Sequence, residues 1–335
     1  MSAESSVVSA DSTLVTIELW ILFFVILAVT IAIDLGVFHK IKRKLTKATS
    51  TELEHVMSTK EALGWTLTWI SLAGVFAGFI YLTLGNDKMI EFVTGYALEK
   101  SLSVDNMFVF LLVFTTLGIP HKYQHRVLSF GILSAIAMRI VLILVGASLL
   151  DNFQWMIYIF GGLLWYTAIR MIVQKEEKKI ELEKNIAVRV LKKFMPVNLS
   201  LVGNKFMTPI NGVMHATPLL VALAIIELTD LVFAMDSIPA VLAITRDPFI
   251  VITSNVFAIL GLRALYFLIG GMMERFHYLK PGLIVLLLFI GTKMIISDIY
   301  HIPTVTSLLI VFIILTTVIV GSLLRKPKPK TTKHE

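Results

Sequence analysis

The sequence predicts an all-α, polytopic membrane protein with about nine transmembrane helices. Of its 335 residues, 56% are hydrophobic and only 16% are charged, whereas soluble domains are about 45–50% apolar and about 25% charged. Many apolar runs reach the roughly 20 residues that an α-helix needs to cross a bilayer. Cysteine is absent, which excludes thiol catalysis, disulfides, iron–sulfur clusters and cysteine zinc sites. The composition therefore excludes an ordinary soluble enzyme and a disordered chain.

Nine apolar segments are the expected spans. Residues 1–17, before the first of them, are Ser-rich and contain no Lys or Arg. They lack the basic start of a cleaved signal peptide, so we expect the first span to remain as an anchor. The expected spans are 18–38, 63–84, 90–117, 127–149, 153–173, 217–243, 249–272, 281–297 and 303–324.

Basic residues alternate from one loop to the next. One set of loops, together with the C-terminal tail, holds 23 Lys and Arg, whereas the opposite set holds only Lys88 and Arg246. Since basic loops stay in the cytoplasm, we expect the N-terminus outside and the C-terminus in the cytoplasm. The basic, Pro-broken tail follows the last span directly, which favours contact with anionic lipid headgroups over nucleic-acid binding.

Two parts of the chain resemble each other at a shift of about 130 residues. Glu99-Lys-Ser-Leu-Ser-Val-Asp105-Asn106 has the form of Asp230-Leu-Val-Phe-Ala-Met-Asp236-Ser237: a carboxylate, five residues, an aspartate and a small polar residue. Further along both parts the basic residues also correspond, Arg139 to Arg263 and Arg170 to Lys293. The order of an acidic, an arginine-bearing and a basic helix therefore occurs twice.

Each of these units contains three spans, so the second must enter the membrane from the side opposite to the first. Inverted repeats are typical of secondary transporters, which bind their substrate near the midplane where the repeats meet. The predicted organisation is a disordered extracytoplasmic N-terminus (1–17), two accessory helices (18–84), the first repeat (85–173), a charged cytoplasmic linker (174–213), the second repeat (214–299), a last helix (300–324) and a basic cytoplasmic tail (325–335).

Six carboxylates fall inside the expected spans, and each costs about 3 kcal/mol near the middle of a membrane. One explanation is structural: intramembrane bases pair with them and hold the bundle together. The alternative is a cation site, because neighbouring Asn and Ser side chains complete a set of oxygen ligands that suits Mg²⁺, Ca²⁺ or Mn²⁺. The acids are Asp34, Glu99, Asp105, Glu227, Asp230 and Asp236, and the candidate charge partners are Arg139, Arg170, Arg263 and Lys293.

Helix geometry limits which of these acids can share an ion. Glu99 and Asp105 lie about 120° apart on an unbroken helix, so we expect local unwinding at the site. Pro239 has no N–H, which leaves the carbonyl of Met235 without its helical partner beside Asp236. The expected metal ligands are Asp105 and Asp236, followed by Asn106, Glu99, Asp230 and Glu227, with the Met235 carbonyl as a backbone ligand and Asp34 as an accessory acid.

Four segments carry a resemblance to a known family: residues 99–106, Glu227-Leu-Thr-Asp230, Met235-Asp236-Ser-Ile-Pro239-Ala, and 247–264 with Asp247-Pro-Phe-Ile and Gly261-Leu-Arg263-Ala. They resemble the TerC family of integral membrane proteins, especially its Alx branch. The resemblance implies a manganese exporter of the bacterial cytoplasmic membrane, with Mn²⁺ as substrate and no permanently bound cofactor. The family's acidic motif falls on the six ligand residues named above. Some members are linked to tellurite resistance, alkaline pH or membrane-protein assembly.

No nucleotide-binding or serine-hydrolase motif is present, so we predict a transporter driven by exchange for protons rather than an enzyme. The residues themselves indicate only a hard divalent cation or a proton. Three alternatives use the same sequence: a proton or alkali-cation exchanger, a membrane-protein assembly or stress-resistance factor whose acids are structural, and a membrane redox enzyme, which the lack of cysteine disfavours. Besides Mn²⁺ and protons, membrane lipids are the expected partners.

Overall fold

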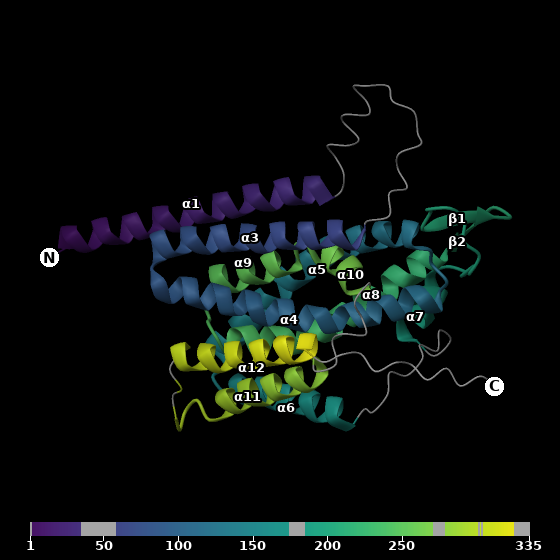
Figure 1. The fold of residues 1–335 in the computed structure, drawn as a ribbon. Coiled ribbons are helices and arrows are strands. Elements are labelled where there is room, and N and C mark those ends of the chain that lie inside the picture. Colours follow the sequence, from purple (N-terminus) through teal and green to yellow (C-terminus); the bar gives the residue numbers. More distant parts are fainter. Residues whose placement is uncertain are drawn as a thin grey trace.

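A computed structural model describes residues 2–34, 58–173, 185–270, 279–300, 302 and 304–324. The long helices lie side by side in one bundle, with helix α7 and a β-hairpin at one end of it (Figure 1). The chain is therefore an all-α, multi-pass membrane protein. Its elements are α1 (Ser2–Asp34), α3 (Thr59–Leu84), α4 (Asn86–Thr116), α5 (His121–Asn152), α6 (Met156–Val173), α7 (Ile186–Phe194), β1 (Met207–Ile210), β2 (Val213–Ala216), α8 (Pro218–Leu242), α9 (Pro248–Ile259), α10 (Leu262–Gly270), α11 (Leu279–Ile295) and α12 (Thr304–Leu324).

Four helices in the described ranges are long and apolar enough to cross a membrane, namely α3, α5, α6 and α8, and the bent pair α9–α10 adds a fifth. Shorter apolar helices cover Ile17–Ile33, Pro281–Ile295 and Leu309–Ser322. Helix α4 is not among these candidates, and its sequence carries the charged residues Glu99 and Lys100. The count of nine spans stays a prediction.

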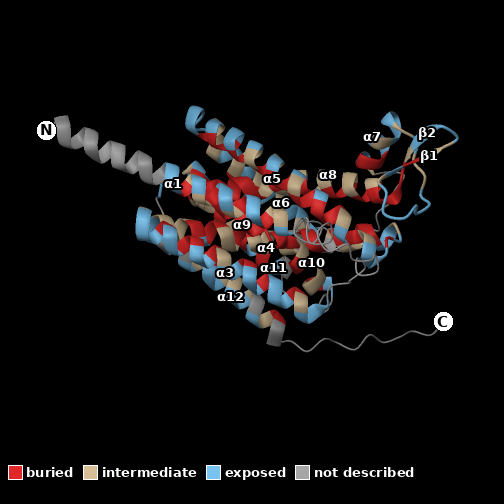
Figure 2. Ribbon diagram, turned by 90° about the horizontal axis from the view of Figure 1, so that it is seen from above, coloured by how far each residue is buried: buried red, intermediate tan, exposed pale blue. Residues whose placement is uncertain are grey.

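Burial is concentrated in the middle of the bundle (Figure 2). Every residue of α9 from Phe249 to Ile259 is buried. Helix α4 packs against α8 and α9, α5 packs against α8, and α6 packs against α11. The outer helices expose large apolar side chains such as Phe24, Leu82 and Phe312, as expected where lipid tails rather than water surround the protein.

The span expected over 249–272 is broken. Its two halves, α9 and α10, meet at an angle of 42°, and Gly261 between them has φ +81°. A Cβ at this position would collide with the Trp69 side chain on α3, so both the backbone conformation and the close approach of Trp69 require glycine.

The unwinding expected beside Asp236 is not observed. Helix α8 runs without interruption from Pro218 to Leu242, with Pro239 inside it. A helix can continue past a proline when the one lost backbone hydrogen bond is tolerated by its surroundings, and Pro239 is buried in the packed bundle. The prediction of a broken helix at Pro239 is therefore wrong, and the break lies in the next span instead.

Part of the linker between the two expected repeats has regular structure. Strands β1 and β2 pair antiparallel with Ile210 opposite Val213. The two turn residues, Asn211 and Gly212, both have positive φ, as the tight Asn-Gly hairpin turn requires. Residues 174–184 of the linker lie outside the described part of the chain.

At the N-terminus, α1 begins at Ser2, within the segment expected to be disordered. Extending an existing helix by further residues needs no new nucleus.

Helices α6 and α11 approach each other closely at two glycines. A Cβ on Gly161 would lie 2.8 Å from Cγ1 of Ile295 and 3.0 Å from the carbonyl oxygen of Gly291. The next residue, Gly162, has nothing within 4 Å of the same position. Small residues at such crossings let membrane helices pack backbone to backbone.

This pair of neighbouring glycines allows a matched test of packing. We expect Gly161→Ala to destabilise the protein by about 1–3 kcal/mol, the usual cost of forcing extra atoms into a packed contact. Gly162→Ala should be neutral or stabilising by up to about 1 kcal/mol, because Ala is the better helix former. Thermal unfolding of both purified variants in detergent checks this, and equal melting temperatures would contradict the close contact.

Candidate functional site

Among the side chains that the structure describes, the most buried charges meet at Arg139, in the middle of α5. Its side chain is 1% exposed and that of Glu99, on α4, is 0% exposed. Nη1 of Arg139 donates to Oε1 of Glu99, and Nη2 lies 3.4 Å from Oδ1 of Asp230 on α8. One guanidinium therefore links two carboxylates on two other helices.

Neutral polar groups surround this ion pair. Oγ of Ser237 and Oδ1 of Asn255 lie 3.5 and 3.4 Å from Nη1 of Arg139. Nδ2 of Asn106 donates to Oδ1 of Asp230 at 3.4 Å, and Oγ of Ser103 donates to Oε1 of Glu99 at 3.4 Å. All of these side chains are buried. We call the group the Arg139 cluster; it contains Glu99, Ser103, Asn106, Arg139, Asp230, Ser237 and Asn255.

The cluster retains capacity for a cation. Oε2 of Glu99 and Oδ2 of Asp230 are buried and have no hydrogen-bond partner within the described residues. Two carboxylates and one guanidinium give the cluster a formal charge of −1. Among the side chains that the structure describes, however, no three His, Asp or Glu residues lie close enough to hold a metal ion. A cation here would share its acids with Arg139.

Two more of the predicted acids, Glu227 and Asp236, have partners outside the cluster. Oε1 of Glu227 accepts a hydrogen bond from Ser134 on α5. Oδ1 of Asp236 accepts one at 2.8 Å from Thr167 on α6, and Arg170, one turn further along α6, is close enough to act on Asp236 electrostatically. The side chains of Asp105 and Asp34 are outside the described part. Met235, expected to offer its carbonyl, has an exposed side chain.

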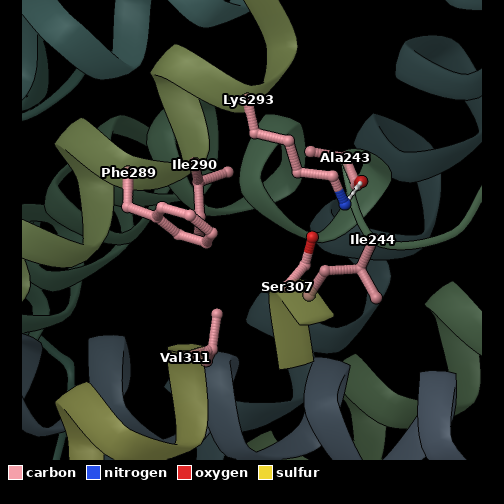
Figure 3. A pocket seen from close by; sticks show the side chains of 7 residues that line it. All are labelled: Ala243, Ile244, Phe289, Ile290, Lys293, Ser307 and Val311. Carbon is pink, nitrogen blue, oxygen red and sulfur yellow. Dashed lines mark hydrogen bonds between the residues drawn. The ribbon is translucent and has the colours of Figure 1, made fainter. Parts of the chain in front are cut away.

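The two remaining candidate bases each have a partner that the sequence did not predict. Nη1 of Arg263 lies 2.7 Å from Nε2 of His125. Nζ of Lys293 donates to the carbonyl of Ala243 at 3.2 Å, beside a small pocket that Phe289 and Ser307 also line (Figure 3). Ala243 is the C-cap of α8, so the ammonium binds a carbonyl at the helix end, where carbonyls have no intrahelical partner.

Two polar contacts were not predicted from the sequence, those of Asn255 and Lys100. Asn255 is buried and contacts Arg139. Its position inside an apolar span could have marked it as a candidate member of the site. Lys100 was not among the candidate charge partners. Its Nζ lies 3.1 Å from the Ala258 carbonyl oxygen and 3.4 Å from the Leu260 carbonyl oxygen, at the break between α9 and α10.

Comparison with known proteins identifies the family. The family model described as "Integral membrane protein TerC family" matches residues 84–330, which include every member of the Arg139 cluster. The chain belongs to the TerC family. A Myxococcus xanthus relative named "Uncharacterized membrane protein STKORF319" is 45% identical over 314 residues, covering 94% of each chain.

Other TerC relatives are similar over nearly their whole length. The Escherichia coli (strain K12) protein named "Putative membrane-bound redox modulator Alx" is 42% identical over 312 residues, 91% of this chain and 94% of its own. A membrane protein of Rickettsia bellii is 39% identical over 307 residues, 92% of this chain and 97% of its own. No solved structure matches the chain.

Proposed function

We propose that this TerC protein is a secondary transporter that exports a hard divalent cation, with Mn²⁺ as its main substrate, across the bacterial cytoplasmic membrane in exchange for protons. The Arg139 cluster carries the proposal. It buries two carboxylates with one guanidinium, and each carboxylate keeps an oxygen without a hydrogen-bond partner in the described ranges. Buried polar groups left unpaired are costly, so a cation bound to these oxygens would offset that cost.

The chemistry of the cluster favours a hard ion. All of its candidate ligand atoms are carboxylate, amide or hydroxyl oxygens, and the full sequence contains no cysteine. Such sets suit Mg²⁺, Ca²⁺ and Mn²⁺ better than Cu⁺ or Zn²⁺. Within that class, the resemblance to the manganese-exporting branch of the family favours Mn²⁺. The ion would compete with Arg139 for Glu99 and Asp230, and protons would compete with it for the same oxygens.

The packing of the helices supports an inverted repeat. In the proposed correspondence, α4, α5 and α6 are equivalent to α8, the α9–α10 pair and α11. Under this correspondence the contact between α4 and α9 is equivalent to the contact between α8 and α5. The contacts between α4 and α8 and between α6 and α11 are each equivalent to themselves. All four contacts are observed. The Arg139 cluster draws on both units, at the place where repeat transporters bind their substrates.

The name of the Alx relatives suggests a redox role as the second possibility. This chain has no cysteine anywhere in its sequence, so it has no thiol to carry electrons. We therefore place transport ahead of redox chemistry. The two remaining alternatives, an exchanger for protons or alkali cations and an assembly factor with structural acids, are outcomes of the test below.

The test is Mn²⁺ flux into proteoliposomes with and without an imposed pH gradient. The wild-type protein is expected to move Mn²⁺ faster when protons can flow in the opposite direction. Glu99→Gln and Asp230→Asn nearly keep the side-chain volume but remove a charge from the Arg139 cluster, and each is expected to lower the flux strongly. Asp236→Asn and Asp105→Asn make the same change at the two acids that the sequence favoured as ligands.

Three results would overturn the proposal. A folded wild-type protein that does not move Mn²⁺ would favour structural acids and the assembly factor. Proton or alkali-cation flux without any divalent flux would favour the exchanger. Mn²⁺ flux of the same rate with and without the pH gradient would show that transport is not coupled to protons.

A further inference from the structure

Lys100 is an ammonium group inside the bundle without a carboxylate partner among the described residues. It follows Glu99 directly on α4, and its hydrogen-bond acceptors in the described ranges are the carbonyl oxygens of Ala258 and Leu260. A lone charge at membrane depth is costly, so these two carbonyls must offset a large part of that cost.

The two carbonyls are available because the span is broken. Helix α9 ends at Ile259, Leu260 is its C-cap, and Gly261 turns the chain by way of a positive φ. The last carbonyls of a helix have no intrahelical N–H partner. They also form the negative end of the helix dipole, which favours a cation. Broken helices in transporters use this combination of freed carbonyls and a half-helix C-terminus to bind monovalent cations.

The charge of the neighbouring cluster favours a cation at the same place. The Arg139 cluster carries a formal charge of −1, and it touches α9 through Asn255, three residues before Ala258. A positive charge at the break therefore lies beside a cluster of opposite sign. The ammonium of Lys100 supplies that charge from the residue next to Glu99.

We propose that the carbonyls of Ala258 and Leu260 form a monovalent-cation site at the α9–α10 break, and that the protein occupies this site with the tethered ammonium of Lys100. The site is separate from the carboxylates proposed to bind Mn²⁺, and the inference does not depend on transport. An alkylammonium or alkali cation of similar size is the class of free ligand that this site would accept once Lys100 is removed.

Chemical rescue tests this assignment. Lys100→Ala removes three carbons and the ammonium, which together correspond to n-propylammonium. The purified variant is expected to melt several degrees below the wild-type protein. Added n-propylammonium chloride should restore the melting temperature with a saturable dose dependence. Uncharged 1-propanol should not restore it, and neither compound should stabilise the wild-type protein.

Lys293→Ala is the matched control. Lys293 also donates to a carbonyl at a helix end, but within the described residues it has one such acceptor, the carbonyl of the residue that caps the continuous helix α8. Rescue of Lys100→Ala alone supports a site at the break. Equal rescue of both variants, rescue by 1-propanol, or a Lys100→Ala protein as stable as the wild type would each overturn the proposal.

A second pair of variants covers the case in which Lys100→Ala does not fold. Lys100→Arg keeps a cation that can reach the carbonyls, whereas Lys100→Met keeps the length of the side chain without its charge. The cation site predicts that the Arg variant melts above the Met variant. A Met variant at least as stable as the Arg variant would show that packing, not charge, holds the break, and would refute the site.

Discussion

Arg139→Met is expected to lose most of its folded population in detergent. The substitution keeps an apolar stem of similar length but leaves Glu99 and Asp230 buried without their shared guanidinium. Removing one partner of a buried ion pair costs about 3–5 kcal/mol, and here two carboxylates lose the same partner. That is a large part of the about 5–15 kcal/mol by which a folded protein is usually stable. Thermal unfolding followed by size-exclusion chromatography measures the loss.

A charge-neutral triple variant separates the cause of this loss. Arg139→Met combined with Glu99→Gln and Asp230→Asn removes all three charges together and is expected to recover most of the melting temperature, because no buried charge is left unpaired. If the triple variant is as unstable as Arg139→Met alone, then packing around Arg139, and not its charge, is responsible.

Asp230→Asn is expected to reduce Mn²⁺ flux, measured well below saturating Mn²⁺, by at least about tenfold, the effect of losing about 1.4 kcal/mol of binding free energy. The amide has nearly the same size as the carboxylate, and Arg139 keeps its pairing with Glu99, so the protein should still fold. The formal charge of the cluster changes from −1 to zero, and the carboxylate oxygen Oδ2, unpartnered in the described structure, is lost as an anionic ligand. Mn²⁺ uptake by proteoliposomes is the measurement.

Asp151→Asn serves as the control for this variant. Asp151 lies at the end of α5 and is exposed, so the same chemical change is made away from the cluster and flux should be unaffected. A folded Asp230→Asn protein with the flux of Asp151→Asn would remove Asp230 from the ion path.

The fold class could be predicted because it depends on hydrophobicity, which acts locally along the chain. A run such as that of α8 must be helical wherever it meets a membrane, since lipid offers no partner for its backbone groups. The Asn211-Gly212 hairpin was also readable from the sequence, because only residues that tolerate positive φ fit that turn. It was missed because the linker was judged by its charge alone.

The composition of the cluster could be predicted only in part. The cost of burying Glu99, Asp230 and Arg139 requires them to meet, and they do. Which base takes which acid depends on helix packing, so the sequence could not show that Arg139 serves two acids while Lys293 binds a carbonyl. Nor could it place the break. Of the 19 glycines of the chain, Gly261 is the one that lies at this break, where its positive φ and the close approach of Trp69 depend on tertiary packing.

The contact between Trp69 and Gly261 gives the molecule an optical reporter. The indole is 6% exposed and stacks on Trp65 with ring centroids 6.0 Å apart. Indole fluorescence responds to the polarity and packing around the ring, so a change of the bend between α9 and α10 would alter the emission of Trp69. Only four other tryptophans compete with that signal: Trp20, Trp65, Trp155 and Trp165. Their replacement by Phe leaves a single-tryptophan protein in which the bend can be followed by spectroscopy in real time.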